Sequence, residues 1–579
     1  MLKKRKEKPA QETTQKKQLR LWPGVAAGIL LLLFKFIVPA VIPDALPLVM
    51  LGGLLFGLII IVWWAFFSRA PRFERWGGLI LMIIALFTVR FFLHETIAKA
   101  GMGWLFPILA IPILSLAIVA WVLVSRRFPD VIRRLTMVVT ILLAIGGWAF
   151  IRTGGLNNEG DSDFRWRWSK TPEEQLLARV EEDPESPPLA LDTAESGLFW
   201  PGFRGHHRDS IIRGVRIKAD WSESPPVELW RRPVGPGWSS FAVQGGLFYT
   251  QEQRGEDETV SCYNIATGNP VWRHQDTARF WESNSGSGPR GTPTLHEDRV
   301  YTLGATGILN VLDALDGSVV WSRNAAEDTQ TQIPVWGIAS SPLVVNDIVI
   351  VAAAGSLIAY ELGTGEPRWS RPAGGDCYSS PHLLTIDGVR QVLLLNETGA
   401  IGLTPIDGTL LWEHSWPGHP IVQPTLIADG DILISADERS GIRRLTVSQG
   451  PGEWSVEERW TSARLKPYFN DSVIHDGHAY GFDGPRLSCI DILDGTRKWK
   501  GGRYGRGQIV LMADQDLLLV MSEKGQLALV MATPDEFMEL TRFLAVEGKT
   551  WNHPVLVGDV LLVRNSQEMT AFRLSLEQE

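Results

Sequence analysis

A ten-residue phrase that recurs through the C-terminal part of the chain limits the possible folds most strongly. It reads YNIATGNPVW, LDALDGSVVW, YELGTGEPRW, LTPIDGTLLW and IDILDGTRKW, with a glycine four residues before a tryptophan in each copy. Successive tryptophans are 49, 48, 43 and 87 residues apart, so the last interval contains two periods. A period of about 40–50 residues with several short strands per unit indicates a propeller or a solenoid. The five pairs are Gly268/Trp272, Gly317/Trp321, Gly365/Trp369, Gly408/Trp412 and Gly495/Trp499.

The residues of this phrase predict a tight hairpin followed by a strand. Alternating apolar residues flank a T-G or D-G pair, which is the usual chemistry of a two-residue hairpin turn. Glycine takes the positive φ that such a turn requires. The tryptophan then stands at a fixed position of the next strand, where its flat ring can fill the gap between neighbouring sheets. We therefore expect both residues of each pair to be structural.

A second phrase, an inner pair of strands, is expected to open each unit. Its eight copies, given at the end of this paragraph, predict eight blades. The hairpin phrase has five clear copies, a degenerate copy near 445–460 and a weak one at 529–543. The eighth unit is expected to close where EMTAFRL at 568–574 meets VELWRR at 227–232, which removes the open sheet edges. The sequence predicts an all-β, eight-bladed propeller over 225–579. The opening pairs of strands are GWSSFAVQGGLFYT, PRGTPTLHEDRVYTLG, IASSPLVVNDIVIVAA, YSSPHLLTIDGVRQVLLL, VQPTLIADGDILISA, FNDSVIHDGHAYGF, GQIVLMADQDLLLVMS and NHPVLVGDVLLVRN.

The N-terminal part is a different kind of sequence. Five apolar stretches follow one another at about 22–43, 46–67, 76–94, 104–124 and 135–151. About 20 apolar residues suffice for a helix to cross a bilayer. We expect a basic cytoplasmic tail at 1–20, five transmembrane helices within 21–152 and a linker with a short helix at 153–224. The first stretch can also be a signal peptide, but no clear A-x-A site follows it, so a retained helix is favoured.

The charges of the loops predict the orientation of these helices. The loop SRAPRFER holds three arginines and the loop SRRFPDVIRR holds four, whereas HETIAKAGMG holds a single Lys99. The positive-inside rule then places the N-terminus and both arginine-rich loops in the cytoplasm and the body outside. The prediction is a multi-pass protein of the bacterial inner membrane with a periplasmic propeller. Lys35 and Arg90 fall within predicted spans, where we expect their long stems to reach the interface, although a quinone-facing role for Lys35 stays open.

Charge and cysteine content narrow the class of the body. Residues 1–152 hold 19 Lys/Arg against 6 Asp/Glu, and the remainder holds 37 against 58. An acidic body argues against nucleic acid as a partner. Cys262, Cys377 and Cys489 form no C-x-x-C-H haem motif and no paired zinc spacing, so we expect them to be buried and unreactive. In the linker, His206 and His207 are adjacent and make a poor metal pair, so WPGFRGHHRDSI is expected to pack against the propeller.

The T/D-G-x-x-x-W hairpin resembles the PQQ-like repeat, whose family includes quinoprotein alcohol and glucose dehydrogenases and the outer-membrane assembly lipoprotein BamB. The resemblance covers roughly 225–575. Five helices before a periplasmic propeller also look like membrane-bound glucose dehydrogenase. The phrases WPGFRG, GPRGTP and TWNHPV resemble uncharacterised bacterial PQQ-like propeller proteins. The resemblance implies a propeller fold, and in catalytic members PQQ on the propeller axis with Ca²⁺ beside it and an Asp as base.

The residues that would support this chemistry do not stand out in the sequence. No two cysteines are adjacent, unlike the Cys-Cys pair of many alcohol dehydrogenases of the family. Eight blades share the body with no obvious insertion to roof a cofactor. A Ca²⁺ set cannot be assigned, because turn and cap roles explain Asp376, Asn470, Asp471 and Asn552 near the blade openings. We therefore assign no catalytic residue, no metal and no cofactor, with PQQ and calcium kept for the alternative below.

The mouth of the axial channel is the predicted ligand site. Aromatic side chains mixed with two arginines and a histidine can hold a planar or anionic ligand. The alternative is that they fill a narrow channel. The residues predicted to bind are Arg290, Trp336, Tyr378, Tyr468, Arg506, Trp551 and His553, and Trp238 and Gln423 occupy equivalent positions.

Three functions are compatible with these features. The favoured one is a non-catalytic propeller, anchored in the lipid bilayer, that binds a protein or another component of the cell envelope. The alternative is a PQQ-dependent dehydrogenase of sugars or alcohols that passes electrons to membrane quinone. A third is a small-molecule sensor that uses the channel mouth.

Overall fold

The computed structural model describes residues 21–42, 45–156, 162–179 and 198–577. The chain forms two compact units, Met1–Ser169 and Lys170–Glu579. The predicted basic tail at 1–20 lies outside the described residues, as do 157–161 and 180–197 of the predicted linker.

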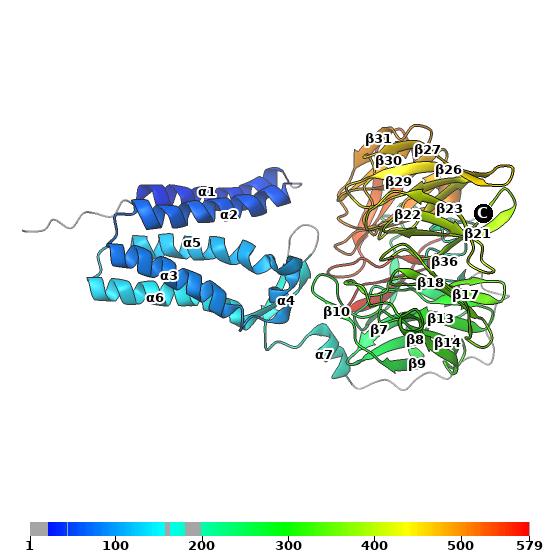
Figure 1. The fold of residues 1–579 in the computed structure, drawn as a ribbon, viewed down its shortest axis with the longest axis horizontal. Helices are drawn as coiled ribbons and strands as arrows, with labels where there is room; N and C mark the ends of the chain where they lie inside the picture. Colours follow the sequence, from blue (N-terminus) through cyan, green and yellow to red (C-terminus); the bar gives the residue numbers. More distant parts are fainter. Residues whose placement is uncertain (1–20, 43–44, 157–161, 180–197, 578–579) are drawn as a thin grey trace, which may run out of the picture. The chain divides into compact units, whose positions relative to one another are not determined.

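In its described residues, the first unit is a bundle of five long helices, visible as the blue and cyan ribbons of Figure 1. A short π-helical segment η1 (Trp63–Phe67) continues α2, and the short helices α4 (Glu95–Ala98) and η2 (Ala100–Gly103) link α3 to α5. A hairpin of β1 (Ile151–Leu156) and β2 (Ser162–Trp166) follows the last long helix and its 3₁₀ extension η3 (Gly147–Phe150). The long helices are α1 (Trp22–Val41), α2 (Leu46–Val62), α3 (Arg72–Val89), α5 (Leu105–Ser125) and α6 (Asp130–Gly146).

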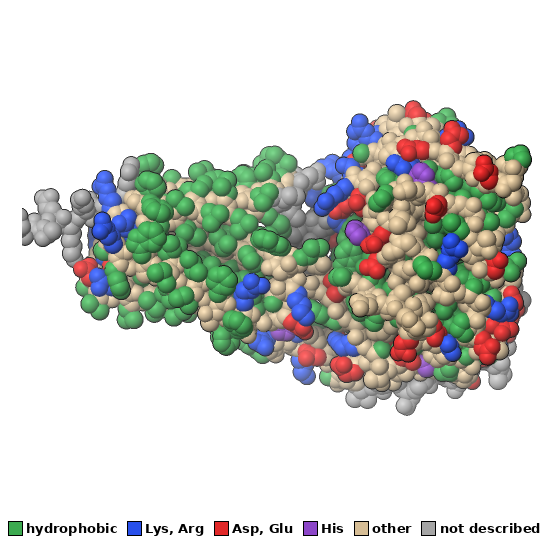
Figure 2. Space-filling view, in the orientation of Figure 1, with side chains coloured by type: hydrophobic (Ala, Val, Ile, Leu, Met, Phe, Trp, Pro, Cys, Tyr) green, Lys and Arg blue, Asp and Glu red, His purple; other side chains and the backbone are tan. Residues whose placement is uncertain are grey.

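Four of these helical segments are long and apolar enough to cross a membrane: Trp22–Val41, Leu48–Phe67, Leu105–Ser125 and Asp130–Phe150. The remaining long helix, α3, has Arg72, Glu74 and Arg75 in its first turn, which lowers its mean hydropathy. Hydrophobic side chains cover most of the visible surface of this unit, and Lys and Arg gather at one end of it (Figure 2). The fold class expected from the sequence, a membrane helix bundle with an eight-bladed propeller, is confirmed.

Small residues allow the helices to approach closely, as is common in membranes. A Cβ on Gly24 of α1 would lie 2.4 Å from the ring of Trp63, so an alanine there would force the helices apart. A polar contact also joins α5 to α2, because the Ser115 hydroxyl donates to the Gly57 carbonyl at 3.0 Å.

Charged residues of the bundle divide between one buried cluster and the exposed surface. Glu74 is 1% exposed and accepts from Arg133 at 2.7 Å, so the first turns of α3 and α6 lie together. Arg134 approaches the same carboxylate at 3.4 Å. Lys35 of α1 and Arg90, which follows the last residue of α3, are both exposed, and their reach to the membrane interface stays a prediction.

The second unit begins with α7 (Pro172–Leu177), the short helix expected in the linker. Thr171 caps it by accepting from the Glu174 N–H, while the Glu174 carboxylate accepts from the Thr171 N–H. Glu173 pairs with Arg279 of the propeller at 2.8 Å, which fixes the helix to the first blade.

Eight sheets follow and form the blades of a propeller, and all their strand pairs except β4 with β32 are antiparallel (Figure 1). The bounds of the first four blades are as follows. Blade 1 contains β3 (Phe199–Trp200), β6 (Ala242–Gln244), β7 (Leu247–Arg254), β8 (Asp257–Asn264) and β9 (Pro270–Thr277); blade 2 contains β12 (Thr294–His296), β13 (Arg299–Leu303), β14 (Ile308–Asp313) and β15 (Val319–Asn324); blade 3 contains β16 (Leu343–Val345), β17 (Ile348–Ala353), β18 (Ser356–Glu361) and β19 (Pro367–Pro372); blade 4 contains β20 (His382–Ile386), β21 (Val389–Asn396), β22 (Gly399–Leu403) and β23 (Leu410–Ser415).

Blades 5 to 8 complete the circle and include the strands that were degenerate in sequence. Blade 5 contains β24 (Thr425–Ala428), β25 (Asp431–Ile434), β26 (Ile442–Gln449) and β27 (Trp454–Ser462); blade 6 contains β28 (Val473–His475), β29 (His478–Asp483), β30 (Arg486–Asp491) and β31 (Arg497–Gly501); blade 7 contains β4 (Ile211–Ile212), β32 (Gln508–Met512), β33 (Leu517–Met521), β34 (Gln526–Met531) and β35 (Glu539–Leu544); blade 8 contains β36 (Val555–Val557), β37 (Val560–Arg564), β38 (Glu568–Arg573) and β5 (Val227–Pro233).

The circle closes as the sequence predicted. Strand β38 pairs with β5, with Glu568 opposite Pro233 and Arg573 opposite Val227. Residues 199–212, which were expected to belong to the linker, contribute β3 to the inner edge of blade 1 and β4 to the inner edge of blade 7. The segment between these two short strands therefore has both of its ends fixed at the axis of the propeller.

Most tryptophans of the repeat contact the next blade rather than their own hairpin. The Trp321 indole N–H donates to the Leu362 carbonyl at 2.9 Å, and its ring lies against Gly365 of blade 3. Trp272 bonds the Ala314 carbonyl at 3.0 Å in the same way. The expectation that these rings fill the gap between sheets is confirmed, and Trp230, which the five-copy pattern omitted, does the same across the closing seam. The ring-on-glycine pairs are Trp230/Gly268, Trp272/Gly317, Trp321/Gly365, Trp369/Gly408 and Trp460/Gly495.

Trp499 of blade 6 meets the next blade without a glycine. Its indole N–H donates to the Thr533 carbonyl of blade 7 at 2.7 Å, as in the other copies. Its ring, however, lies against Phe537, with ring centroids 5.6 Å apart. Blade 7 carries the weak copy of the hairpin phrase, in which TPDEF replaces the turn with glycine. The structural role expected for Trp499 therefore holds, but an aromatic ring takes the place of the glycine against which the other rings pack.

The boundary between blades 4 and 5 departs further from the pattern. The hairpin between β26 and β27 of blade 5 has no D-G or T-G turn, and the Trp412 N–H of blade 4 bonds the Gln391 side chain of its own blade at 2.6 Å. The Trp412 donor therefore stays within its own blade, while its ring is buried among residues of blades 4 and 5. Contact across this boundary comes instead from Arg443 of blade 5, which bonds His414 at 2.9 Å and covers the Trp416 ring at 4.1 Å.

The glycine contact generates a stability prediction. Gly365 has φ +73°, and a Cβ there would lie 2.6 Å from the Trp321 ring. Gly365→Ala should lower the free energy of unfolding by about 2–4 kcal/mol, because backbone strain and a ring clash add. Gly477→Ala is the matched control: its φ is +74° with no atom within 4 Å, so about 1 kcal/mol of strain is expected. Pulse proteolysis in urea measures both, and equal losses would show that the ring contact contributes nothing.

Candidate functional site: the axial pocket and its floor

A ring of hydrogen bonds passes from blade to blade around the axis. In blades 1 to 5, the backbone N–H two positions before the inner strand donates to a side-chain oxygen of the next blade. Ser240 donates to Thr292 at 3.0 Å, and Thr292 donates to Ser341 at 3.0 Å. The same link runs from Ser341 to Ser380 at 2.9 Å, from Ser380 to Gln423 at 2.8 Å and from Gln423 to Asp471 at 2.8 Å.

Blades 6, 7 and 8 close the ring with side-chain amides instead. Gln508 of blade 7 donates to the Phe469 carbonyl at 3.3 Å and to the Trp551 carbonyl at 3.0 Å. Asn552 of blade 8 then donates to the Ser239 carbonyl of blade 1 at 2.7 Å. The inner polar groups are thus bonded to each other, which buried polar groups require.

The segment between β3 and β4 closes one end of the channel. Arg204, Arg208 and Ser210 have φ of 63°, 54° and 60°, a left-handed conformation that non-glycine residues seldom adopt. Three such residues within seven positions carry strain that surrounding contacts must offset. We call residues 201–210 the plug.

Two arginines of the plug bond the blades directly. Arg204 is 1% exposed; it donates to the Ser472 carbonyl at 3.1 Å and lies 3.4 Å from the Asp471 carboxylate. Arg208 donates to the Pro381 carbonyl at 2.9 Å and to the Pro342 carbonyl. Burial and the neighbouring Arg204 lower the pKa of the Arg208 guanidinium to about 10, which leaves it charged at neutral pH. The plug therefore ties together blades 3, 4 and 6.

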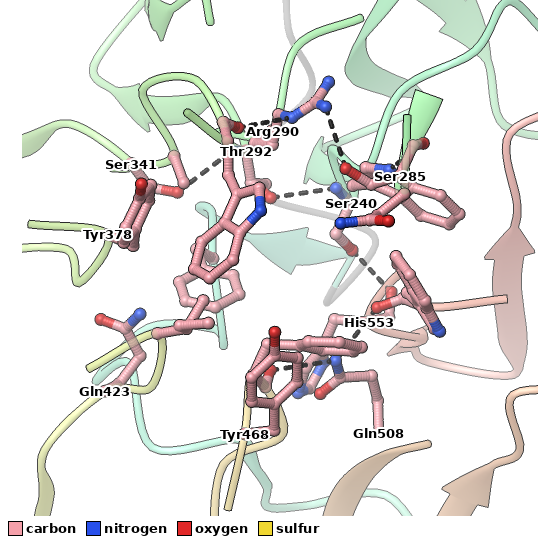
Figure 3. Close-up of a pocket in the computed structure, with 18 of the residues that line it drawn as sticks. Ser240, Ser285, Arg290, Thr292, Ser341, Tyr378, Gln423, Tyr468, Gln508 and His553 are labelled. Carbon is pink, nitrogen blue, oxygen red and sulfur yellow. Dashed lines mark hydrogen bonds between the residues drawn. The ribbon is translucent and has the colours of Figure 1, made fainter. Parts of the chain in front are cut away.

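A cavity of about 190 Å³ lies on the axis with the plug residue Phe203 and the hydrogen-bond ring among its walls. Figure 3 shows the labelled residues arranged around this space, with dashed lines joining Ser240 to Thr292 and Thr292 to Ser341. The lining residues are Phe203, Trp238, Ser240, Glu282, Asn284, Ser285, Arg290, Thr292, Trp336, Ala339, Ser341, Tyr378, Ile421, Gln423, Tyr468, Phe469, Gln508, Trp551 and His553.

Aromatic rings form most of the wall. Trp336 and Tyr378 contact each other with ring centroids 5.2 Å apart. On another part of the wall, Trp551 lies 4.7 Å from Trp238 and 4.8 Å from Phe469. Tilted pairs at these distances are favourable aromatic contacts.

The cations at the pocket already have partners. Arg290 donates to the Trp336 carbonyl at 3.1 Å and to the Ser285 hydroxyl at 3.0 Å, and burial lowers the pKa of its guanidinium to about 10. Arg506 stacks on the Tyr468 ring at 3.6 Å and pairs with Glu438 at 2.9 Å.

Lys549 is a third cation beside the pocket. Its amine lies 4.3 Å from the Trp551 ring centre and 5.3 Å from that of Trp238, and it donates to the Asn284 carbonyl at 2.8 Å. Burial lowers the pKa of this amine to about 8, against the opposing effect of Glu282 and Glu523. Cations thus already cover several rings of the wall.

The histidine of the pocket is held neutral. His553 is 5% exposed, and its Nε2 lies 3.1 Å from the Ser210 hydroxyl of the plug. Burial lowers the pKa of its imidazole to about 3, and the charge of Arg204 acts in the same direction. A neutral imidazole bonded to the plug has a structural role at physiological pH.

The structure brings the sequence-predicted ligand residues together. Six of the seven line this one cavity, and Arg506 lies beside it against Tyr468. Trp238 and Gln423 line it as well. The six are Arg290, Trp336, Tyr378, Tyr468, Trp551 and His553.

Sequence reasoning missed one side of the pocket. Residues 278–289 insert a small hairpin between blades 1 and 2, with β10 (Trp281–Glu282) paired to β11 (Gly286–Ser287). It supplies Glu282, Asn284 and Ser285 to the wall. The expectation that no insertion exists was therefore wrong here, and the long interval between Trp272 and the phrase GPRGTP was the available signal.

The other predicted positions lie as follows. Asp471 and Asn552 belong to the hydrogen-bond ring, and Asn470 accepts from the Tyr468 N–H at 2.9 Å. Asp376 does not line the pocket. The three cysteines are free and buried, as expected, and burial raises the pKa of the Cys377 and Cys489 thiols to about 12. Among the described residues, one group with metal-ligating geometry stands elsewhere, at His475, Asp476 and Asp516.

Comparison with known proteins relates the first blades to one family. The family model of outer membrane protein assembly factor BamB matches residues 221–388. BamB of Shewanella oneidensis is 28% identical over 155 residues, which cover 25% of this chain and 36% of that protein. BamB of Escherichia coli is 25% identical over 138 residues, 23% of this chain and 34% of that protein. The chain thus spans about a third of the length of these relatives.

Solved structures resemble more of the chain at low identity. BamB of Moraxella catarrhalis is 14% identical, covers 61% of this chain and 99% of its own, and has a TM-score of 0.41. The quinohemoprotein alcohol dehydrogenase of Comamonas testosteroni is 14% identical, covers 70% and 85%, and has a TM-score of 0.49.

The plug generates a prediction for local opening. Arg208→Ala removes the bonds to blades 3 and 4, so amide hydrogen exchange in residues 199–212 should accelerate about tenfold or more, while the outer strands keep their protection. Arg213→Ala is the matched control, because the Arg213 side chain is 53% exposed and pairs with Asp209 of the same segment. Equal exchange in the two variants would show that Arg208 does not hold the plug.

Proposed function

We propose, on the premise that this chain carries a PQQ-like β-propeller, that it is a membrane-anchored binding or scaffold protein of the bacterial cell envelope that performs no catalysis. The observation that carries the proposal is the state of the polar groups in the axial pocket. The hydrogen-bond ring, the backbone of the pocket and the plug already bond the polar groups of Thr292, Arg290 and His553, in that order. A surface of satisfied polar groups and aromatic rings suits recognition rather than bond-making chemistry.

The pocket fits PQQ with Ca²⁺ poorly. Calcium takes six to eight oxygen ligands, with carboxylates prominent among them. The carboxylate that lines this pocket, Glu282, accepts the Asn284 N–H at 2.7 Å and also the Ser285 N–H and hydroxyl. It caps the β10–β11 turn, and among the described residues no Asp lines the cavity. The residues present therefore do not form a calcium set there.

The carboxylates of the quinone would also lack donors. PQQ is a tricarboxylate, so it needs cations with N–H groups directed at it. Arg290 directs its N–H groups to the Trp336, Gly288 and Gly286 carbonyls and to Ser285. This donor set does not match the cofactor, so it supports no step of a dehydrogenase reaction.

A PQQ-dependent dehydrogenase is the second candidate. One observation favours it: aromatic rings surround a cavity on the propeller axis, the position at which catalytic members of the resembling family hold PQQ. In that case the helices would pass electrons to membrane quinone, and the substrate would be a sugar or an alcohol.

The relatives suggest the class of partner. The matched proteins are outer membrane protein assembly factors, so we propose an envelope protein as partner of the propeller. The second proposed partner is the lipid bilayer, in which the apolar helices would be embedded. We further propose that the propeller lies on the periplasmic side of the inner membrane.

The orientation depends on whether α3 crosses the bilayer. The buried Glu74–Arg133 pair places the first turns of α3 and α6 together, as expected if both helices start in the cytoplasm. The arginine-rich loops before α3 and before α6 would then share that side. Five crossings carry the chain after α6 to the periplasm, whereas four would leave it in the cytoplasm.

Labelling of introduced cysteines tests this topology. The native cysteines are buried, so they give a low background. Lys99→Cys should react with a membrane-impermeant maleimide in intact spheroplasts, because Lys99 lies after α3 and its side chain is 62% exposed. Arg127→Cys, in the loop after α5, should react only after permeabilisation. The reverse pattern would mean that α3 does not cross and that the propeller is cytoplasmic.

Titration with PQQ and Ca²⁺ separates the two candidate functions. We expect the purified full-length protein in nanodiscs to show no saturable change in quinone absorbance or melting temperature up to about 1 mM PQQ with excess Ca²⁺. A membrane-bound glucose dehydrogenase reconstituted in parallel is the positive control. Saturable PQQ binding together with sugar- or alcohol-dependent dye reduction would overturn the proposed binding function and support the dehydrogenase.

A further inference from the structure

We propose that the axial pocket accepts one aromatic side chain from an extended segment of the partner protein. This inference rests on the proposed binding function and specifies what that site recognises. Four features of the pocket lead to it: its size and walls, its closed floor, the state of its polar groups, and the apolar rim next to it.

The size and the walls suit a single ring system. The cavity measures about 190 Å³, and aromatic side chains face it from several blades. The Trp336/Tyr378 pair and the Trp238/Trp551/Phe469 cluster supply ring faces and edges. A tryptophan, tyrosine or phenylalanine side chain would be buried among them with favourable tilted contacts. Such buried aromatic anchors commonly dominate protein–protein affinity.

The closed floor excludes a chain that threads through the propeller. Phe203 of the plug lines the cavity, and Arg204 and Arg208 hold the plug against the blades. A ligand therefore enters and leaves by the same mouth. A side chain can insert while its own backbone stays outside, which suits a protein partner.

The polar groups argue against sugars and against anions. Every sugar hydroxyl that enters gives up water and needs a new partner. The lining residues Thr292, Gln423 and Arg290 already bond other protein groups, so these groups offer little to an entering sugar. Glu282 and Arg290 lie 3.9 Å apart with opposite charges, so the lining has no net charge to attract an ion.

The cations already present argue against a cationic ligand. Lys549 lies over Trp551, and Arg506 over Tyr468, so these two rings of the wall already have positive neighbours that would repel an ammonium group. A neutral ring meets no such repulsion. Aromatic side chains remain the best match among these ligand classes.

The rim suggests an occupant larger than one ring. Ile333 and Val335 stand three positions and one position before the wall residue Trp336, and they are 43% and 76% exposed. Apolar residues this exposed beside a pocket are typical of contact with a partner. The charged pair Arg506–Glu438, beside Tyr468 of the wall, offers both signs of charge to the polar backbone of a peptide.

Short peptides test the inference with the full-length protein in nanodiscs. The probes are Ac-Gly-Trp-Gly-NH₂ and Ac-Gly-Leu-Gly-NH₂, followed by saturation-transfer NMR and calorimetry. We expect the Trp peptide to bind at least about tenfold more tightly than the Leu peptide. Ala339→Phe fills the cavity and should weaken binding of the Trp peptide at least tenfold, and Trp336→Ala should weaken it through loss of a wall. Trp454→Ala, on the outer strand of blade 5, is the matched control and should leave binding unchanged.

The outcomes separate this inference from the proposed function. Equal binding of the two peptides, or binding that Ala339→Phe does not alter although its melting temperature is native, would overturn the aromatic anchor. Displacement of the Trp peptide by chitobiose would assign the pocket to glycans instead. Failure of both peptides at about 5 mM in a protein that also ignores PQQ overturns the inference alone. Binding of PQQ with dye reduction overturns the proposed function itself.

Discussion

The indole N–H of a repeat tryptophan finds its acceptor in the neighbouring blade, and the architecture depends on this contact. Trp321 bonds the Leu362 carbonyl at 2.9 Å while its ring lies on Gly365, where any side chain would collide with it. One residue pair thereby satisfies a buried donor and fills the gap between two sheets. Because the acceptor lies in the next blade, a single blade cannot bury such a tryptophan. Only a closed circle lets Trp230 of the last blade meet the first blade in the same way.

The inner hydrogen-bond ring links neighbouring blades near the axis, as the tryptophans link them at the periphery. Its members differ in type, since Thr292, Ser341, Gln423 and Asp471 all accept from a backbone N–H of the preceding blade. What they share is an oxygen within reach, not a common size or charge. With these groups engaged, the pocket above them presents mainly ring faces, and its charged residues occur as pairs of opposite sign.

The repeat was predictable from sequence because glycine and tryptophan at a fixed spacing are rare and have one physical explanation. The seam between β38 and β5 followed from counting strands. Trp230 escaped because Pro226, and not a glycine, stands four residues before it, so the repeated phrase does not include it. The hydrogen-bond ring escaped for a different reason. Its acceptors precede prolines in blades 2 to 5, as in Thr292–Pro293 and Ser341–Pro342, but a polar residue before proline is also an ordinary turn signal. The predicted ligand residues lie in one cavity because the inner strands of all blades begin next to the axis, so the residues at their starts are neighbours in space. The plug could not be predicted in this way, because its left-handed arginines depend on contacts some hundreds of residues away in the sequence.

Those distant contacts have a consequence for the order in which the molecule forms. Apart from the two-residue β3, the plug precedes every strand of the propeller in the chain, yet Arg204 bonds a residue 268 positions later. Ile217, shortly after the plug, bonds the side chain of Gln515, 298 positions later. Closing such long loops is entropically costly until the intervening strands are in place. The segment that leaves the ribosome before the propeller must therefore wait for blades 6 and 7 before it can dock. The plug is thus synthesised early but docks among the last parts of the propeller. A docked plug therefore indicates that the circle of blades has closed.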